Sequence, residues 1–263
     1  MPTTLIIRTA GTNCDQEMIR AFQLAGADTQ LIHLDNLIAD PAPLETCDII
    51  GFPGGFSYGD DIASGRVFAV KVREQLFPQL RAAADRGVLM LGVCNGFQVM
   101  AQAGLLPDPT GDNQPTIALT QNSAGRFIDD WVRIETDPDS PCIWTNNLDL
   151  GLAGEDRENA MRLPLASGEG RFVAASDSTL QQLEANHQLP IRYLDNPNGS
   201  QANIAAVCDP AGRLLGLMPH PDRYLNWTNH PYWTNLPGPL RNGDTPGLKL
   251  FRNAVESVMM TTA

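Results

Sequence analysis

The chain has 263 residues, of which 43% are hydrophobic and 18% charged, and its formal net charge is −12. These proportions are typical of a folded globular protein and exclude a disordered one. No apolar run approaches the ~18 residues of a membrane span, and no cluster of lysine and arginine offers a surface for nucleic acid. We therefore expect neither a membrane nor a nucleic acid as a partner.

The cysteines are few, and no two of them form a recognisable pair: Cys14, Cys47, Cys94, Cys142 and Cys208. Their odd number and wide spacing argue against a disulfide framework and favour a reducing, cytoplasmic location. No C-x-x-C pair or His/Cys cluster has the spacing of zinc ligands, so no metal is predicted. The start of the chain, MPTTLIIRTA, lacks the basic lead of a secretory signal and is interpreted as the first strand of the fold.

The first hundred residues alternate between predicted strands and predicted helices. A first helix, capped by Asn13 or Asp15, is expected to end at Gly26. A glycine-rich loop, PGGFSYGDD, then precedes a long helical region that ends at Gly87, and a later helix over 94–103 ends at Gly104. This alternation predicts a parallel sheet with helices on both faces. The strands expected here span residues 4–8, 29–34, 48–52 and 88–93.

The segment from about residue 108 to 215 is richer in short strands and turns. Its predicted strands, at 131–136, 171–174 and 191–194, are separated by Pro, Gly, Asn and Asp. The turn Asp209-Pro210-Ala211-Gly212 joins two apolar runs and predicts a hairpin. A long aromatic loop at 224–239 precedes a last helix over 247–260. We interpret residues 1–263 as a single α/β domain with a β-rich excursion in its middle.

The sequence GVCNGFQ, at residues 92–98, places Cys94 between two glycines directly after a predicted buried strand. G-x-C-x-G between a strand and a helix has the form of a nucleophile elbow. Small residues at both sides allow close packing around a strained backbone, and the side chain then projects into the crevice beyond the sheet. The N–H groups of the helix start lower a thiol pKa and bind an oxyanion. We interpret Cys94 as a nucleophile rather than as an inert buried cysteine.

A catalytic thiolate needs a base, and the chain contains four histidines. His33 lies in a strand-like segment and is expected at the core or at a sheet edge. His187 precedes a proline in a loop and is expected in solvent, and His230 has no sequence neighbour that suggests a role. These patterns leave His220 as the candidate base.

His220 stands between two prolines in the segment LGLMPHPDR. Proline confines the preceding residue to extended backbone, so His220 and Asp222 are predicted to point to the same side. A carboxylate beside an imidazole fixes its tautomer and stabilises its charged form, as in a catalytic triad. A rigid proline turn with two exposed polar residues is the alternative for this segment alone. Together with Cys94, a triad is the favoured interpretation.

The order of these motifs resembles that of the triad-type (class I) glutamine amidotransferases. Within this family the chain is most similar to glutaminase subunits that serve purine biosynthesis, because GFSYGD and NPNGS distinguish that subfamily. The resemblance implies a flavodoxin-like, doubly wound, mostly parallel sheet with a β-rich insertion. The matching segments are GTNCD at 11–15, GFPGGFSYGD at 51–60, GVCNGFQ at 92–98, GEGR at 168–171, NPNGS at 196–200 and MPHPDR at 218–223.

The resemblance also implies roles for individual residues. Cys94 would be the nucleophile, His220 the general acid and base, and Asp222 the carboxylate that orients the imidazole. The PGG segment fits an oxyanion hole and equally fits a tight turn, and Gln98 fits either a substrate contact or helix packing. The residues implied for the oxyanion hole and the substrate pocket are Gly54, Gly55, Asn95 and Gln98.

Three positions depart from the family pattern. Asp222 stands where the family has glutamate, so its shorter side chain has to reach the imidazole through a different backbone placement. Ser167 stands before GEGR where the family usually has histidine, and Asp61 follows GFSYGD where an aromatic residue is common. None of these changes removes the nucleophile.

The activity implied is hydrolysis of glutamine to glutamate, with ammonia delivered to a separate ATP-dependent synthetase subunit. A small bridging subunit is a further implied partner. The chain has no Walker-type G-x-x-x-x-G-K-[ST] sequence, so no cofactor is expected in it, and ATP and Mg are assigned to the synthetase. Two alternatives remain at this point: a non-catalytic partner-binding module in which Asp222 no longer aligns His220, and another cysteine hydrolase of the same architecture.

Overall fold

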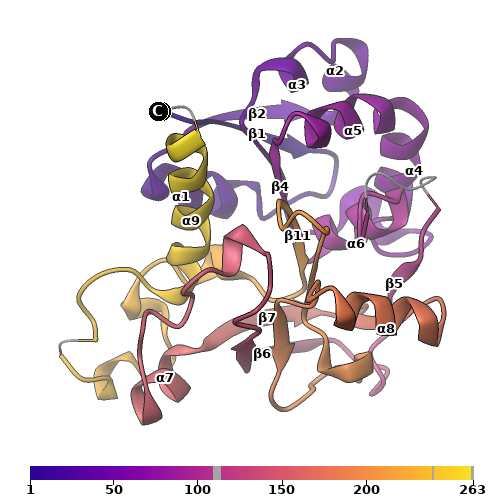
Figure 1. Ribbon diagram of the computed structural model, residues 1–263. Helices are drawn as coiled ribbons and strands as arrows, with labels where there is room; N and C mark the ends of the chain where they lie inside the picture. Colours follow the sequence, from indigo (N-terminus) through magenta and orange to yellow (C-terminus); the bar gives the residue numbers. More distant parts are fainter. Residues whose placement is uncertain (109–113, 239, 262–263) are drawn as a thin grey trace.

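The computed structural model describes residues 1–108, 114–238 and 240–261 (Figure 1). Its main sheet has six strands in the order β10-β11-β4-β3-β1-β2. Five of them pair in parallel, and β10 is an antiparallel edge strand that forms the predicted hairpin with β11. The strands are β1 (Thr3–Arg8), β2 (Asp28–His33), β3 (Ile49–Phe52), β4 (Leu89–Val93), β10 (Ala206–Cys208) and β11 (Leu214–Leu217).

The strand order confirms the flavodoxin-like winding. Without the antiparallel edge strand, the order is β2-β1-β3-β4-β11, which is the doubly wound 2-1-3-4-5 arrangement. Every residue of β3 and β4 is buried, as expected for central parallel strands covered on both faces. In such a sheet, ligands bind beyond the carboxyl ends of the strands, where the chain reverses its direction of winding.

Helices cover both faces of this sheet. On one side α1 (Asp15–Ala25) packs against α9 (Pro246–Thr261), and on the other α4 (Arg66–Gln75) packs against α6 (Asn95–Ala103) (Figure 1). In the part of the chain that the structure describes, no helix has the length and apolar character needed to cross a bilayer.

Several predicted boundaries in this half were wrong. The single long helical region is two helices, α4 and α5 (Phe77–Asp85), because Leu76 leaves the helical conformation two residues before Pro78. The second strand ends at His33, whose side chain accepts a hydrogen bond from the N–H of Asp35 and begins α2 (Leu34–Ala39). The short helix α3 (Pro43–Thr46) was also not predicted.

The ends of the first helix follow the sequence in part. Gly26 adopts the predicted left-handed conformation, with φ 99°, at the end of α1. The predicted cap was wrong: Cys14 precedes the helix without any side-chain cap, and Asp15 pairs instead with Arg8, at 3.1 Å between Nη1 and Oδ2. Gly104 ends α6 with φ 80°, as predicted.

The β-rich insertion between β4 and β11 is confirmed. It contains a two-stranded and a three-stranded antiparallel sheet, the second in the order β7-β6-β9. The strands β5 and β7 and two helices were not predicted, and β6 starts three residues before its predicted start. The elements of the insertion are β5 (Ile117–Thr120), β6 (Ile128–Thr136), α7 (Gly154–Ala160), β7 (Arg162–Ser167), β8 (Arg171–Ala174), α8 (Asp177–Ala185) and β9 (Ile191–Tyr193).

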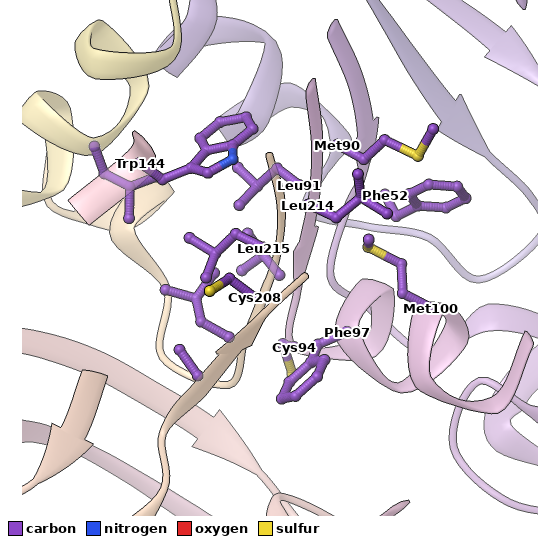
Figure 2. Packing of buried hydrophobic residues seen from close by; sticks show 14 of the residues in the cluster. Phe52, Met90, Leu91, Cys94, Phe97, Met100, Trp144, Cys208, Leu214 and Leu215 are labelled. Carbon is purple, nitrogen blue, oxygen red and sulfur yellow. The ribbon is translucent and has the colours of Figure 1, made fainter. Parts of the chain in front are cut away.

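The helix α6 lies directly on the central strands, with Met100 turned toward Phe52 (Figure 2), and glycines allow this close approach. A Cβ on Gly96 would lie 1.8 Å from the carbonyl oxygen of Phe52, and one on Gly216 would lie 2.1 Å from the ring of Phe97. A Cβ on Gly92 would lie 2.6 Å from the sulfur of Met100. The small residues around Cys94 are therefore required by the close approach of the helix to the sheet.

This contact predicts a large cost for Gly96→Ala. The added methyl group would overlap backbone that cannot move without disturbing β3, so we expect the free energy of unfolding to fall by about 3 kcal/mol. Urea unfolding followed by circular dichroism measures the change. Gly238→Ala is the matched control, because its Cβ would approach nothing closer than 4.0 Å. Equal unfolding midpoints for the two variants would contradict the packing described here.

Candidate active site

A cavity of about 250 Å³ lies where the loops after β1, β3, β4 and β11 meet the insertion. This is the position at which a doubly wound sheet binds its ligands. The fold therefore places chemically active side chains from distant parts of the sequence around one space. Lining residues that matter for the chemistry include Cys14, Gly55, Asp60, Cys94, Glu169 and His220.

Cys94 occupies the sharp turn between β4 and α6. Its φ of 53° and ψ of −107° are strained for a residue with a side chain. The backbone holds this conformation from both sides: the N–H of Cys94 donates to the carbonyl of Leu217 at 2.8 Å, and its carbonyl accepts from the N–H of Gln98 at 3.1 Å. The predicted elbow is present, and the thiol lines the cavity.

His220 and Asp222 are buried neighbours beside this thiol. Nδ1 of His220 lies 3.3 Å from Oδ1 of Asp222, and the two side chains are 2% and 0% exposed. The N–H of His220 donates to the carbonyl of Pro164 at 2.7 Å, which fixes the histidine against β7. The predicted reason for the pairing was wrong. Pro221–Arg223 forms a 3-10 turn rather than extended chain, and this turn carries the shorter aspartate back to the imidazole.

The charges around His220 determine its protonation. Burial alone would lower the pKa of this imidazole, but the negative charges of Asp222 and Cys94 outweigh burial and raise the pKa to about 9. The side chain is therefore an imidazolium at neutral pH, next to a cysteine sulfur.

The two glycines of the PGG segment have different surroundings. A Cβ on Gly54 would lie 2.9 Å from Cε1 of His220, so glycine at this position allows the imidazole to approach the loop. Gly55 lines the cavity, and its φ of 136° is a conformation that other residues rarely adopt. The N–H of Asn95, the first residue of α6, has no preceding helical turn to bond.

The side chains of Asn95 and Gln98 belong to a buried amide network. Nδ2 of Asn95 donates to Oε1 of Gln98 at 3.1 Å and to Oδ1 of Asp60 at 3.2 Å. Nε2 of Gln98 donates to the carbonyl oxygen of Glu169 at 2.5 Å. Gln98 does line the cavity, but both ends of its amide bond within the protein, which favours the packing alternative over a direct substrate contact.

Several side chains at the cavity had no predicted role. Sγ of Cys14 accepts a hydrogen bond from Nη2 of Arg223 at 3.1 Å. Burial and the charge of Asp222 raise the pKa of the Cys14 thiol to about 12, so it stays protonated. Asp60 and Glu169 also line the cavity. The GTNCD, GFSYGD and GEGR motifs contain three of these residues and are the signals that mark them.

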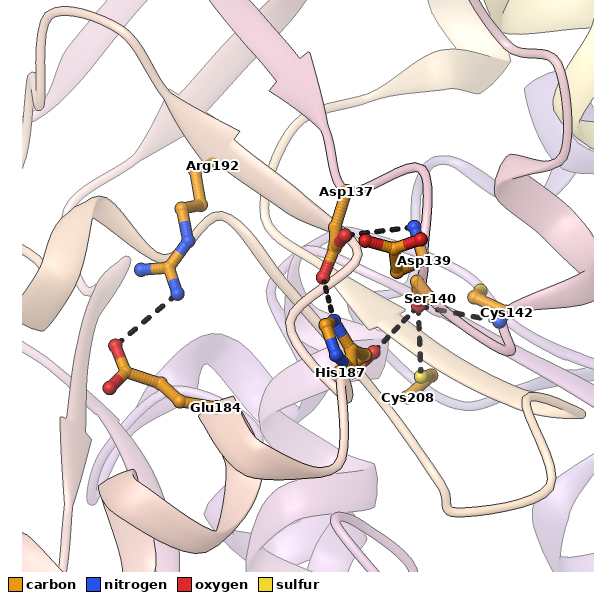
Figure 3. Close-up of polar contacts among 8 residues, drawn as sticks. All are labelled: Asp137, Asp139, Ser140, Cys142, Glu184, His187, Arg192 and Cys208. Atoms are coloured by element: carbon orange, nitrogen blue, oxygen red, sulfur yellow. Dashed lines mark hydrogen bonds and ion pairs between the residues drawn. The ribbon is translucent and has the colours of Figure 1, made fainter.

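The other histidines lie in unrelated surroundings. His187 pairs with Asp137 at 2.9 Å, and together with Asp139 they form an exposed cluster whose ligand atoms lie within 4.8 Å of one another (Figure 3). Asp137 follows β6 at the end opposite to Asp129, a residue of the cavity wall; eight residues of extended strand separate them by about 26 Å. This cluster is therefore no part of the cavity.

His230 is structural, which its sequence neighbours did not indicate. It is 1% exposed and packs against Trp131 and Tyr224. Its Nε2 lies 2.9 Å from the carbonyl oxygen of Asn159, and its Nδ1 accepts from the N–H of Tyr232. The aromatic loop at 224–239 thus packs on the insertion, and its last residue, Pro239, lies outside the described residues.

A cysteine and a histidine that line one cavity on a doubly wound sheet, with a carboxylate buried beside the histidine, are the features of an amidotransferase with a cysteine nucleophile. The family model for the CobB/CobQ-like glutamine amidotransferase domain matches residues 1–258, and the chain belongs to this family.

Curated relatives match along almost the whole chain. It is 39% identical over 259 residues to phosphoribosylformylglycinamidine synthase subunit PurQ of Dehalococcoides mccartyi, covering 96% of each protein. It is also 39% identical over 276 residues to the subunit of the same name from Methanococcus maripaludis, covering 97% of each.

Solved structures agree with this assignment. A chain of PurLQS from Thermotoga maritima superposes with a TM-score of 0.69 at 30% identity, covering 97% of this chain and 98% of that one. The glutaminase domain of Trypanosoma brucei CTPS, solved with bound acivicin, gives a TM-score of 0.56 at 14% identity and covers 98% and 94%. The second likeness is one of fold.

The environment of His220 predicts the effect of Asp222→Asn. The carboxylate charge of Asp222 raises the pKa of His220, whereas burial lowers it. When that charge is removed, we expect the pKa of His220 to fall by at least one unit from about 9. NMR titration of the imidazole C–H signals, assigned with a His220→Gln variant, measures it. Asp137→Asn is the control, because it removes the carboxylate of the pair with His187, which is no part of the cavity, and should leave His220 unchanged. An unaltered His220 titration in Asp222→Asn would show that this charge does not act on the imidazole.

Proposed function

We propose that this chain is the glutaminase subunit of phosphoribosylformylglycinamidine synthase. In this proposal the whole chain acts as one amidotransferase domain, which hydrolyses glutamine to glutamate and ammonia. The observation that carries the proposal is that Cys94 and His220 line one cavity, with Asp222 buried beside the imidazole, in a chain whose relatives are PurQ subunits along almost their whole length.

The first step is attack by the Cys94 thiolate on the side-chain amide carbon of glutamine. The strained elbow supports this role because it fixes the sulfur at the cavity wall without a flexible loop. The imidazolium of His220 supports the thiolate, since opposite charges within the buried site stabilise each other. Attack converts the amide carbonyl oxygen to an oxyanion.

The oxyanion is assigned to the backbone N–H groups of Gly55 and Asn95. Gly55 lines the cavity, and Asn95 begins a helix, where an unpaired N–H and the helix dipole both favour negative charge. Gly54, the third residue predicted for this role, is better explained by its contact with His220.

His220 then donates its proton to the departing nitrogen, and ammonia leaves as the C–N bond breaks. A glutamyl thioester remains on Cys94. His220, now neutral, takes a proton from water, which attacks the thioester and releases glutamate. Asp222 stabilises the protonated imidazole, and its 3.3 Å contact supports catalysis over the non-catalytic alternative.

The ammonia is used by a separate synthetase subunit that binds ATP and Mg, with a small bridging subunit as a further partner. The relative solved as PurLQS supports such an assembly. Three exposed apolar side chains at or beside the cavity wall offer a surface for the synthetase: Phe56, Ile62 and Phe127 are 49%, 75% and 51% exposed. The five unpaired cysteines support a reducing, cytoplasmic location.

Cys94→Ala tests the central role of the thiol. With the nucleophile removed, we expect glutamate release from glutamine by the assembled complex to fall by at least about 1,000-fold, because no thioester forms. Cys47→Ala is the matched control, a buried cysteine outside the cavity that should keep activity within about threefold. Equal rates for the two variants would refute catalysis by Cys94.

Ile62→Ser tests the proposed partner surface. Ile62 lies between two residues that line the cavity, Asp60 and Ser64, so it sits where a synthetase would have to cover the site. We expect its loss to weaken synthetase binding about tenfold, corresponding to about 1.4 kcal/mol. Calorimetry with purified subunits measures the affinity. Leu24→Ser, an exposed apolar residue near the far end of α1, should bind like the wild type; equal weakening would reject the surface.

A further inference from the structure

We infer that Asn122 and Asn198 are positioning residues for the reaction. They hold the wall segment, which we define as residues 166–170, beside the Cys94 thiol. The inference rests on the proposed glutaminase function, because it names residues that shape the cavity for that reaction. It also gives a role to NPNGS, a matching segment that the catalytic groups do not explain.

The wall segment forms one side of the cavity, which its residues 166–169 line. The carbonyl oxygen of Ala166 lies 3.6 Å from Sγ of Cys94, and that of Glu169 accepts from Nε2 of Gln98 at 2.5 Å. A substrate amide between this segment and the thiol has to meet the sulfur at about 3–3.5 Å, and a displacement of about 1 Å can cost about 100-fold in rate. The placement of the wall segment is therefore a condition of catalysis.

Asn122, in the loop between β5 and β6, holds the wall segment at three points. Its Nδ2 donates to the carbonyl oxygen of Ser167 at 2.8 Å, and its Oδ1 accepts from the N–H of Gly170 at 3.1 Å. Its backbone N–H donates to the carbonyl oxygen of Gly168 at 2.9 Å. The segment turns from β7 to β8, and this single residue replaces the pairing that a neighbouring strand would give to its buried backbone groups.

Asn198, in the NPNGS segment, holds the end of the wall segment. Its Nδ2 donates to the carbonyl oxygen of Gly170 at 2.8 Å. Its Oδ1 accepts from both the N–H and the hydroxyl of Ser200, at 3.1 and 2.8 Å, and that hydroxyl accepts in turn from a backbone N–H of β8 at 3.0 Å. The carbonyl oxygen of Asn198 accepts from the N–H of Ser123 at 3.0 Å. The two asparagines therefore belong to one hydrogen-bonded unit around the wall segment.

Both asparagines act from behind the cavity. Asn122 and Asn198 are 2% and 0% exposed, and they are not among the described residues that line the cavity. Their effect on the reaction has to pass through the wall segment. The nucleophile is held separately, because the backbone of Cys94 bonds to Leu217 and Gln98. Loss of either asparagine should therefore impair the use of glutamine and leave the thiol itself unaltered.

Two reactions of the same thiol test the inference. Glutamine hydrolysis needs a correctly placed substrate, whereas alkylation by iodoacetamide needs only a reactive and accessible sulfur. In the assembled complex, we expect Asn122→Ala and Asn198→Ala to lower kcat/KM for glutamine at least about tenfold. The rate of alkylation of the Cys94 peptide, measured by mass spectrometry, should change less than about threefold because the elbow is intact.

Asn253→Ala is the matched control. Asn253 is a buried asparagine of α9 whose Nδ2 donates to the carbonyl oxygens of Trp144 and Asn146, at 2.9 and 2.7 Å. Its loss should lower the midpoint of urea unfolding and leave both reactions unchanged. Ser200→Ala removes only the hydroxyl that bonds to Asn198 and should lower kcat/KM for glutamine about threefold. This milder variant decides the question where an asparagine variant fails to fold.

A fall in alkylation equal to the fall in hydrolysis would overturn the inference, because the whole site would then depend on the asparagines for its fold. Hydrolysis at the wild-type rate in the variants would overturn it as well, and so would an equal loss in Asn253→Ala. Each of these outcomes leaves the glutaminase standing, since the wild-type complex still hydrolyses glutamine. A wild-type complex without that activity would reject the proposed function and the inference together.

Discussion

The contact between α6 and the central strands is the constraint on which the site depends. Because Gly96 lies against the carbonyl of Phe52, the helix starts immediately at the end of β4, and the chain has to turn within one residue. That residue is Cys94, held with a positive φ by hydrogen bonds to Leu217 and Gln98. The strain is borne by a fully packed core, so the sulfur is positioned by the least deformable part of the molecule.

The buried charge of Asp222 completes the activation of the site. Asp222 has no exposed side-chain surface, and its negative charge therefore acts on His220 with little screening by water. The departure from the family's glutamate is accommodated by backbone: the 3-10 turn after His220 returns the shorter carboxylate to the imidazole.

Much of the site could be predicted from the sequence because short stretches of neighbouring residues determine it. The elbow at Cys94, the proline-flanked His220 and the parallel sheet each follow from a few adjacent residues or from strand and helix alternation. What depends on tertiary packing was missed. Nothing near His230 in the sequence shows that Trp131 and Tyr224 bury it, and the strands β5 and β7 gain their stability from partners far away in the chain. The contact between His220 and Asp222 was likewise predicted from extended backbone around the prolines. In the structure it depends on a 3-10 turn over Pro221–Arg223, which the sequence did not indicate.

The proposed catalysis requires a covalent bond between Cys94 and the glutamyl group. Two thiols line the cavity, those of Cys14 and Cys94. The nucleophile is therefore identified by which of the two cysteines carries the glutamyl group. Rapid acid quenching of the complex during turnover of glutamine, followed by peptide mass spectrometry, identifies the residue that carries the thioester. We predict one glutamyl group on the peptide that contains Cys94. Turnover with the adduct on Cys14, or with no adduct on either cysteine, would contradict catalysis by Cys94.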